Sequence, residues 1–194
     1  MRRLIAGMKI SLDGKVVAAD GYPEWVQAWS EDYDLTPQID ACLLGRAMYP
    51  DYERYWTAVI EAPDRLHPMT GALPTADEIA WARHVPQLPH YVLSATSQAA
   101  LWPNTRFLRS TEDVAELLRQ SGKDIYLVGG AETIAGLIDS GLVHELRLIV
   151  YPLVSVGGTA LFSTIQATHA LEQLQARRLG DGRVRLDYRI AAAR

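Results

Sequence analysis

Two adjacent glycines, Gly129 and Gly130, mark the part of the sequence that most clearly suggests chemistry. They follow an unbroken apolar run, residues 125–128, which predicts a strand covered on both faces. Apolar residues at helical spacing come next, in residues 134–138. The start of such a helix presents backbone N–H groups at the positive end of its dipole, so the turn predicts a phosphate or pyrophosphate site. The same pattern can be only a tight connection, since neither GxGxxG nor a GxxxxGK[ST] loop is present.

Acidic residues near the N-terminus are the candidates for proton transfer. Glu24 lies at the start of a predicted helix, and Asp13 lies in the turn after the first predicted strand. Asp20 and Asp32 are further possibilities. Both leading candidates also have a structural explanation, because an acid stabilises the first turn of a helix and Asp-Gly favours a turn.

Composition narrows the function classes. The chain has 194 residues, 48% of them hydrophobic and 22% charged, which predicts one domain over residues 1–194. A net charge of -4 argues against nucleic acid or an anionic membrane as partner. Cys42, the one cysteine, lies in an apolar run and is predicted to be a buried thiol, and the five histidines lack metal-ligand spacing. The N-terminal apolar stretch is too short for a signal peptide or membrane span, so a cytoplasmic location is predicted.

The elements that must position these residues alternate between strands and helices. Strands are predicted at residues 4–11, 41–44, 91–93, 125–128, 145–154 and 183–190. Helices are predicted at residues 23–32, from the capping residue Thr75, at 111–119 and after the glycine pair, with a proline-containing loop at 62–74. A hairpin turn at 180–182 precedes the last strand, whose alternating arginines are predicted to be its solvated face.

This order of elements predicts an α/β fold with a mostly parallel central sheet, covered on both faces and closed by an antiparallel C-terminal hairpin. In such sheets ligands bind beyond the carboxyl ends of the strands. Three predicted loops lie there, at residues 45–46, 94–96 and 129–130.

Four motifs in this order resemble a known family. They are SLDG at residues 11–14, DACLLGR at 40–46, YVLS at 91–94 and VGGAETIAGLIDSGLVHELRL at 128–148. The sequence resembles the dihydrofolate-reductase-like superfamily, and within it most closely the riboflavin-biosynthesis reductase (RibD C-terminal) domain and its stand-alone members. The resemblance spans nearly the whole chain and implies a three-layer dihydrofolate-reductase-like fold.

The resemblance also implies NADPH as the cofactor. The implied cofactor-binding residues are Gly45, Arg46, Ser94 and Arg109 with Ser110 on the phosphate side, and the backbone amides of Gly129, Gly130 and Ala131 at the pyrophosphate. An arginine meets a phosphate with a two-pronged fork that lysine lacks. In dihydrofolate reductases the bond between the two glycines is cis, and we expect the same here. Met48 and Pro50 depart from the usual GR-x-T-Y-E motif, so a hydroxyl directed at the phosphate is absent.

The activity that the resemblance implies is NADPH-dependent hydride transfer to a small heterocycle, of the pteridine or ribosylamino-pyrimidine type used in riboflavin biosynthesis. Glu24 corresponds best to the carboxylate of dihydrofolate reductases, and Asp13 is the acid typical of the family. A homodimer is also implied. Two alternatives stay open, a true dihydrofolate reductase and a non-catalytic nucleotide-binding protein. Aromatic residues including Tyr49, Tyr52 and Trp56 could flank the substrate or simply be core.

Overall fold

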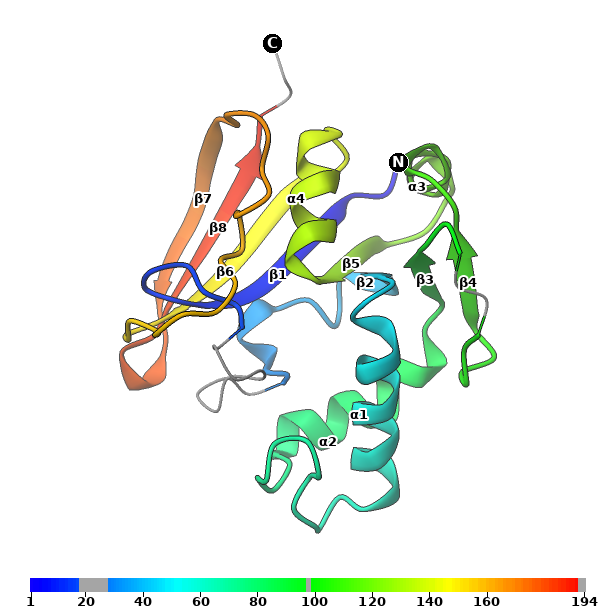
Figure 1. Cartoon of the computed structure of the whole chain (residues 1–194), viewed down its shortest axis with the longest axis vertical. Coiled ribbons are helices and arrows are strands. Elements are labelled where there is room, and N and C mark those ends of the chain that lie inside the picture. The colour runs from blue at the N-terminus through cyan, green and yellow to red at the C-terminus, as the bar shows by residue number, and fades with distance from the viewer. Residues whose placement is uncertain (18–27, 97–98, 192–194) are drawn as a thin grey trace.

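The central sheet runs through the whole fold and has eight strands in the computed structural model, which describes residues 1–17, 28–96 and 99–191 (Figure 1). Its spatial order is β4 (Thr105–Leu108), β3 (His90–Leu93), β2 (Ile39–Gly45), β5 (Asp124–Gly129), β1 (Leu4–Ser11), β6 (Glu145–Tyr151), β8 (Val184–Ile190) and β7 (Leu171–Arg178). The first six strands in this order are parallel, and β8 is antiparallel to both of its neighbours. The predicted parallel sheet with a C-terminal antiparallel hairpin is therefore confirmed.

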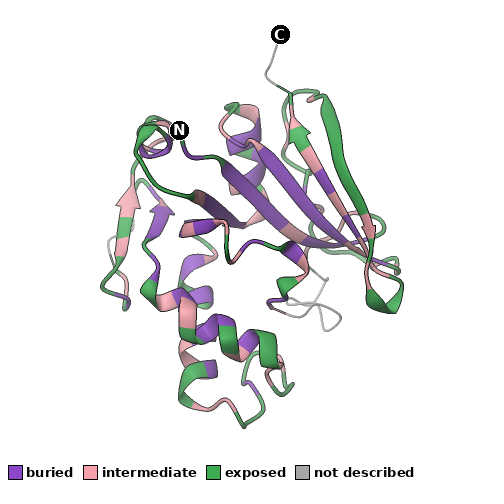
Figure 2. Ribbon diagram, turned by 180° about the vertical axis from the view of Figure 1, so that it is seen from behind, coloured by how far each residue is buried: buried purple, intermediate pink, exposed green. Residues whose placement is uncertain are grey.

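Helices cover both faces of the sheet. Helices α1 (Tyr49–Glu61) and α2 (Ala76–His84) pack on one face, and α3 (Thr111–Arg119) and α4 (Ala131–Asp139) pack on the other (Figure 1). A hydrophobic core lies on each face of the sheet. Alternating residues of β5 contribute to both: Tyr126 and Val128 pack in the core under α1 and α2, and Ile125 and Leu127 in the core under α3 and α4. The inner strands are buried, whereas the edge strand β7 is almost entirely exposed (Figure 2).

Local signals fixed several boundaries correctly. The Thr75 hydroxyl accepts a hydrogen bond from the Glu78 N–H while the Glu78 carboxylate accepts one from the Thr75 N–H, which is the predicted capping box of α2. Residues 62–74 contain neither helix nor strand, as predicted. Cys42 is fully buried, and burial raises the pKa of its thiol to about 12, so it is the structural thiol that its apolar surroundings predict.

One predicted helix differs from the structure, and three elements, α1, β4 and β7, were not predicted. The helix predicted over residues 23–32 begins outside the described residues, and its described end is wrong because only a short 3-10 helix, η1 (Glu31–Tyr33), forms there. Helix α1 was not predicted, although Pro50 suits its first turn and Tyr52, Trp56 and Val59 form its buried stripe. Strand β4 is short, without the alternation of buried and exposed residues that marks a half-buried strand.

The prediction that the polar face of the last strand is solvated is wrong for Arg185 and Asp187. Their exposed fractions are 3% and 4%, and the guanidinium and carboxylate meet through two hydrogen bonds of 2.8 and 2.7 Å. The Arg185 guanidinium also donates to the carbonyl of Asp32 at 2.8 Å. The segment around η1 therefore covers this face and supplies the acceptors that a buried arginine needs.

Candidate functional site

The carboxyl ends of four neighbouring parallel strands lie along one edge of the sheet. In spatial order β4 ends before Arg109, β3 before Ser94, β2 at Gly45 and β5 at Gly129. The structure thus brings together, at one edge, the loops from which the sequence predicts cofactor binding. This is the edge at which open α/β sheets bind their ligands.

The glycine pair forms a backbone cradle at the end of β5. The peptide bond between Gly129 and Gly130 is cis, as expected, and Gly129 has a φ of 137° that favours glycine. A Cβ on Gly129 would lie 3.2 Å from the Met48 sulfur and 3.5 Å from the Met8 sulfur, whereas a Cβ on Gly130 would meet nothing within 4 Å. The backbone is therefore packed against two sulfur atoms at Gly129 and open at Gly130.

Helix α4 begins immediately after this cradle. Gly130 is its N-cap, and no side chain caps the helix start. The first backbone N–H groups of α4 are consequently left for another acceptor, at the positive end of the helix dipole. An anion such as a pyrophosphate suits this position, and the open space above Gly130 leaves room for it.

Gly45 allows the same helix to approach β2. A Cβ on Gly45 would lie 2.0 Å from the Thr133 hydroxyl oxygen and 3.1 Å from the Thr133 Cβ. No side chain fits into that space, so glycine at this position keeps the first turn of α4 against the end of β2. Gly45 therefore shapes the site by steric fit.

Arg46 lies in the turn that joins β2 to α1. Its side chain is exposed, and no described residue forms an ion pair with it. The turn is closed by the Met48 N–H, which donates to the Gly45 carbonyl at 3.2 Å, and α1 begins directly afterwards with Pro50 in its first turn. The guanidinium is thus held at the carboxyl end of β2, where its exposed charge suits an anion.

Ser94 and Arg109 lie side by side, directly after the neighbouring strands β3 and β4. The Arg109 guanidinium donates to the Ser94 carbonyl at 2.8 Å and lies 5.6 Å from the centre of the Phe107 ring. Ser110 is occupied as the N-cap of α3, where its hydroxyl accepts from the Asp113 N–H at 3.4 Å. Arg109 is therefore a second exposed cation on this edge, while Ser110 acts as a cap.

The two acids predicted for catalysis have different outcomes. Glu24 lies outside the described residues. Asp13 is exposed, and its carboxylate accepts from the Ser11 hydroxyl at 2.6 Å and from the Ser155 N–H at 3.0 Å. The hydrogen bond from Ser11, followed by that from Ser155, lowers the pKa of Asp13. The carboxylate is ionised at neutral pH and ties two turns together, which suits a structural role better than proton donation.

Sequence reasoning missed Lys9, a lysine in the otherwise apolar strand β1. Its exposed fraction is 6%, and burial lowers the pKa of its ammonium group from 10.5 to about 7, against the opposing effect of the Glu78 and Asp32 carboxylates. The signal was available in LIAGMKIS, where Lys9 is the one charged residue and shares a face with the buried Ile5. A perturbed amine near a predicted ligand edge is a functional candidate.

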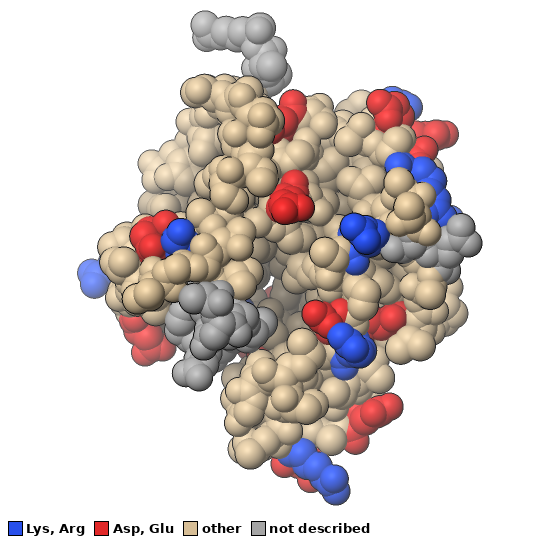
Figure 3. All heavy atoms as spheres, viewed as in Figure 1, with Lys and Arg blue, Asp and Glu red and all other residues tan. Residues whose placement is uncertain are grey.

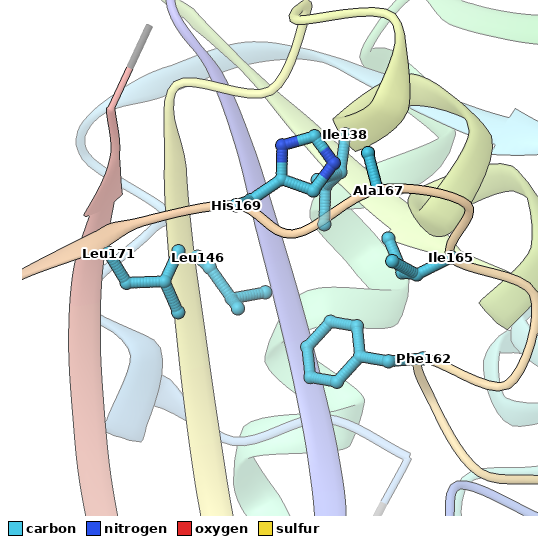
Figure 4. A pocket seen from close by; sticks show the side chains of 7 residues that line it. All are labelled: Ile138, Leu146, Phe162, Ile165, Ala167, His169 and Leu171. Atoms are coloured by element: carbon cyan, nitrogen blue, oxygen red, sulfur yellow. The ribbon is translucent and has the colours of Figure 1, made fainter. Parts of the chain in front are cut away.

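The molecular surface is hollowed between the sheet and the part of the molecule that contains α1 and α2 (Figure 3). A separate cavity of about 170 Å³ lies between α4, β6 and the segment leading to β7 (Figure 4). It is lined by Ile138, Leu146, Phe162, Ile165, Ala167, His169 and Leu171. None of these residues belongs to the loops at the carboxyl ends of β2 to β5, so this apolar cavity is distinct from the candidate site.

Two other classes of site were sought in the described part of the chain. Within residues 1–17, 28–96 and 99–191, no three His, Cys, Asp or Glu side chains gather in a way that could hold a metal ion. Among the helices described there, none combines the length and apolarity needed to cross a membrane.

The chain is similar in sequence to a known protein family and to one of its relatives. The family model for the RibD C-terminal domain matches residues 2–184. The uncharacterized protein YyaP of Bacillus subtilis (strain 168) is 31% identical over 194 residues, covering 96% of this chain and 94% of YyaP.

Two solved structures show the fold. The riboflavin biosynthesis reductase Rib7 of Saccharomyces cerevisiae has a TM-score of 0.62 at 16% identity, covering 98% of this chain and 90% of that one. The dihydrofolate reductase of Enterococcus faecalis, solved in complex with NADP(H), has a TM-score of 0.59 at 14% identity, covering 97% and 96%. The sheet and its flanking helices are thus the dihydrofolate-reductase-like fold that the motifs predict.

Proposed function

The chain belongs to the RibD C-terminal domain family, and from that premise we propose that it is an NADPH-dependent reductase. The proposed substrate is a small heterocycle of the pteridine or ribosylamino-pyrimidine type. When bound, the cofactor supplies a hydride from its nicotinamide ring. The residues of the chain bind and orient the two reactants and provide the proton that completes the reduction.

One observation carries the proposal: an open backbone cradle, an uncapped helix start and an exposed arginine lie along one sheet edge. Gly130 leaves space that a Cβ would occupy, and α4 starts there without a side-chain cap. Arg46 lies at the end of the adjacent strand β2. A dinucleotide carries a pyrophosphate and, in NADPH, a further phosphate, so its charges match both features.

Arg46 is the proposed contact for the 2′-phosphate, with Ser94 and Arg109 beside it. A charge-assisted hydrogen bond to a phosphate contributes roughly 1.5–3 kcal/mol, which corresponds to about a ten- to hundredfold preference for NADPH over NADH. Gly45, Gly129, Gly130 and Ala131 are the proposed contacts for the rest of the cofactor.

A homodimer in the cytoplasm is part of the same proposal. Phe162, Leu171 and Leu174 are partly exposed apolar residues on and beside the edge strand β7, which supports an association surface there. Sedimentation equilibrium of the purified chain tests the dimer directly, and a monomer at micromolar concentration contradicts it.

Isotope transfer tests the proposed reaction. The protein is incubated with NADPH deuterated at the transferred position and either 7,8-dihydrofolate or 5-amino-6-(5-phosphoribosylamino)uracil. One deuterium in the reduced product, measured by mass spectrometry, is the expected result. Binding of NADPH without transfer to either compound refutes the proposed substrate class and favours the non-catalytic alternative, whereas transfer to dihydrofolate alone favours the true dihydrofolate reductase.

A further inference from the structure

Lys9 lies where β1 extends past β5. The pairing of β1 with β5 covers Leu4–Ala6, whereas its pairing with β6 continues to Ser11. Met8, in this extension, lies with its sulfur 3.5 Å from the position of a Cβ on Gly129, so the extension reaches the level of the glycine cradle. Lys9 is the next residue, and successive side chains of a strand point to opposite faces. The ammonium group is therefore directed to the α1–α2 face, across the sheet from the start of α4.

The surroundings of Lys9 are aromatic and charged. Its nitrogen lies 5.8 Å from the centre of the Tyr33 ring, within range of a cation–π contact. Among the described residues, charged groups act on it from the elements packed around it: Asp32 of η1, Asp77 and Glu78 of α2, and Arg183 immediately before β8. The Glu78 carboxylate is itself held by the N–H groups of Thr75 and Ala28, and Asp32 pairs with Arg183 at 2.9 Å.

Burial of a lysine at this position is costly, because it removes the ammonium group from water. Desolvation lowers the pKa of Lys9 to about 7, so at neutral pH the group can both donate and regain a proton. Asp13, the described acid candidate, is exposed and already ionised. Lys9 therefore combines burial, a place on the strand that reaches the level of the glycine cradle, and a lowered pKa.

We propose that Lys9 is the proton donor of the reduction, an inference that rests on the proposed reductase function. The Lys9 ammonium gives one proton to the substrate nitrogen or oxygen beside the carbon that receives the hydride. The N–H bond on Lys9 breaks, a new N–H or O–H bond forms on the substrate, and the displaced π electron pair holds that proton. The substrate gains two electrons with the hydride, the nicotinamide loses them, and Lys9 recovers its proton from water.

The sequence makes a direct test of Lys9 practicable, because Lys9, Lys15 and Lys123 are the only lysines in the chain. Protein labelled with ¹³C at the lysine ε carbon, without cofactor, should give three resonances, which Lys15→Arg and Lys123→Arg assign. We expect the resonance that vanishes in Lys9→Met to titrate near pH 7. A Lys9 resonance that titrates near 10.5 overturns the proposal, and this readout needs no substrate; the surface variants Lys15→Arg and Lys123→Arg assign it even where Lys9→Met does not fold.

Kinetics then separate this proposal from the proposed function. Lys9→Met should lower kcat roughly 10²- to 10⁴-fold with 7,8-dihydrofolate or the ribosylamino-pyrimidine, and leave the Kd for NADPH unchanged. Lys15→Met, which removes a lysine outside the site, is the matched control and should retain activity. Turnover of Lys9→Met within threefold of the wild type overturns the proton-donor role alone. Failure of the wild-type protein to bind NADPH, or to reduce either compound, overturns the proposed function and the role of Lys9 with it.

Discussion

Replacing Gly45 by alanine tests how closely the cofactor site depends on the contact between β2 and α4. The new Cβ would lie 2.0 Å from the Thr133 hydroxyl oxygen, although real Cβ contacts are not shorter than 3.0 Å. Relief requires either that Thr133 turn to the other of the two χ1 rotamers that Thr adopts in a helix, or that the two elements separate by about 1 Å. Gly45 does not have a positive φ, so the backbone itself tolerates alanine.

Overpacking of this kind costs about 1–3 kcal/mol of unfolding free energy. A displacement of about 1 Å in a binding constellation can also weaken function roughly a hundredfold. Urea denaturation should therefore show Gly45→Ala destabilised within that range, and nicotinamide fluorescence should show weakened NADPH binding. Gly136→Ala is the matched control in α4: its Cβ meets nothing within 4 Å, so helix propensity should stabilise that variant by up to about 1 kcal/mol.

A double-mutant cycle identifies the cause. Thr133→Gly removes both atoms that the new Cβ approaches, so adding Gly45→Ala to Thr133→Gly should cost less than adding it to the wild type. Thr133→Ala leaves a Cβ at 3.1 Å and should relieve the strain only in part. Equal costs in all three backgrounds, or wild-type stability and NADPH affinity of Gly45→Ala itself, refute the steric reasoning.

Three further predictions concern stability. Lys9→Met removes a buried amine whose pKa is lowered to about 7. Between pH 7 and 10 the lysine is protonated in the unfolded chain but deprotonated in the folded chain, so the folded state gains stability as the pH rises. The free energy of unfolding of the wild type should therefore rise by about 3 kcal/mol relative to the variant over this range. Parallel pH curves of the two proteins in urea denaturation contradict this. Asp187→Ala removes the buried carboxylate of the pair and leaves Arg185 with only the half-exposed Asp34 carboxylate, which should cost about 1.5–3 kcal/mol; a loss below about 1 kcal/mol in the same assay shows that Asp34 compensates for Asp187. Thr75→Ala removes the cap of α2 and should cost about 1 kcal/mol without changing NADPH binding, so weaker binding would reveal a link between α2 and the cofactor.

Short sequence patterns predicted most of the strands and helices. The apolar run before Gly129 and the capping box at Thr75 are signals confined to a few residues, and both elements formed as predicted. Helix α1 was overlooked because its stripe consists of aromatic residues that suit a ligand site as well as a core. Burial of Arg185 could not be predicted, because it depends on a segment about 150 residues earlier in the chain that lies over β8.

In the candidate site too, some features could be predicted from the sequence and others depend on contacts between distant segments. The order of the loops placed Gly45, Arg46, Ser94 and Gly129 at one edge, since parallel strands align their carboxyl ends. The interlocking of Gly45 with Thr133 depends on the packing of α4 against β2, which no spacing in the sequence reveals. The environment of Lys9 is also non-local, because η1, α2 and the start of β8 supply the charges around it.

Cofactor binding tests the proposed reductase function most directly. Purified protein is titrated with NADPH and with NADH, followed by nicotinamide fluorescence, and the titrations are repeated on Arg46→Ala and on Arg119→Ala, an exposed arginine in the last turn of α3. We expect tight NADPH binding, about a ten- to hundredfold preference over NADH, loss of that preference in Arg46→Ala and its retention in Arg119→Ala. Absence of binding to either nucleotide contradicts the reductase account and leaves a dihydrofolate-reductase-like fold with a different ligand.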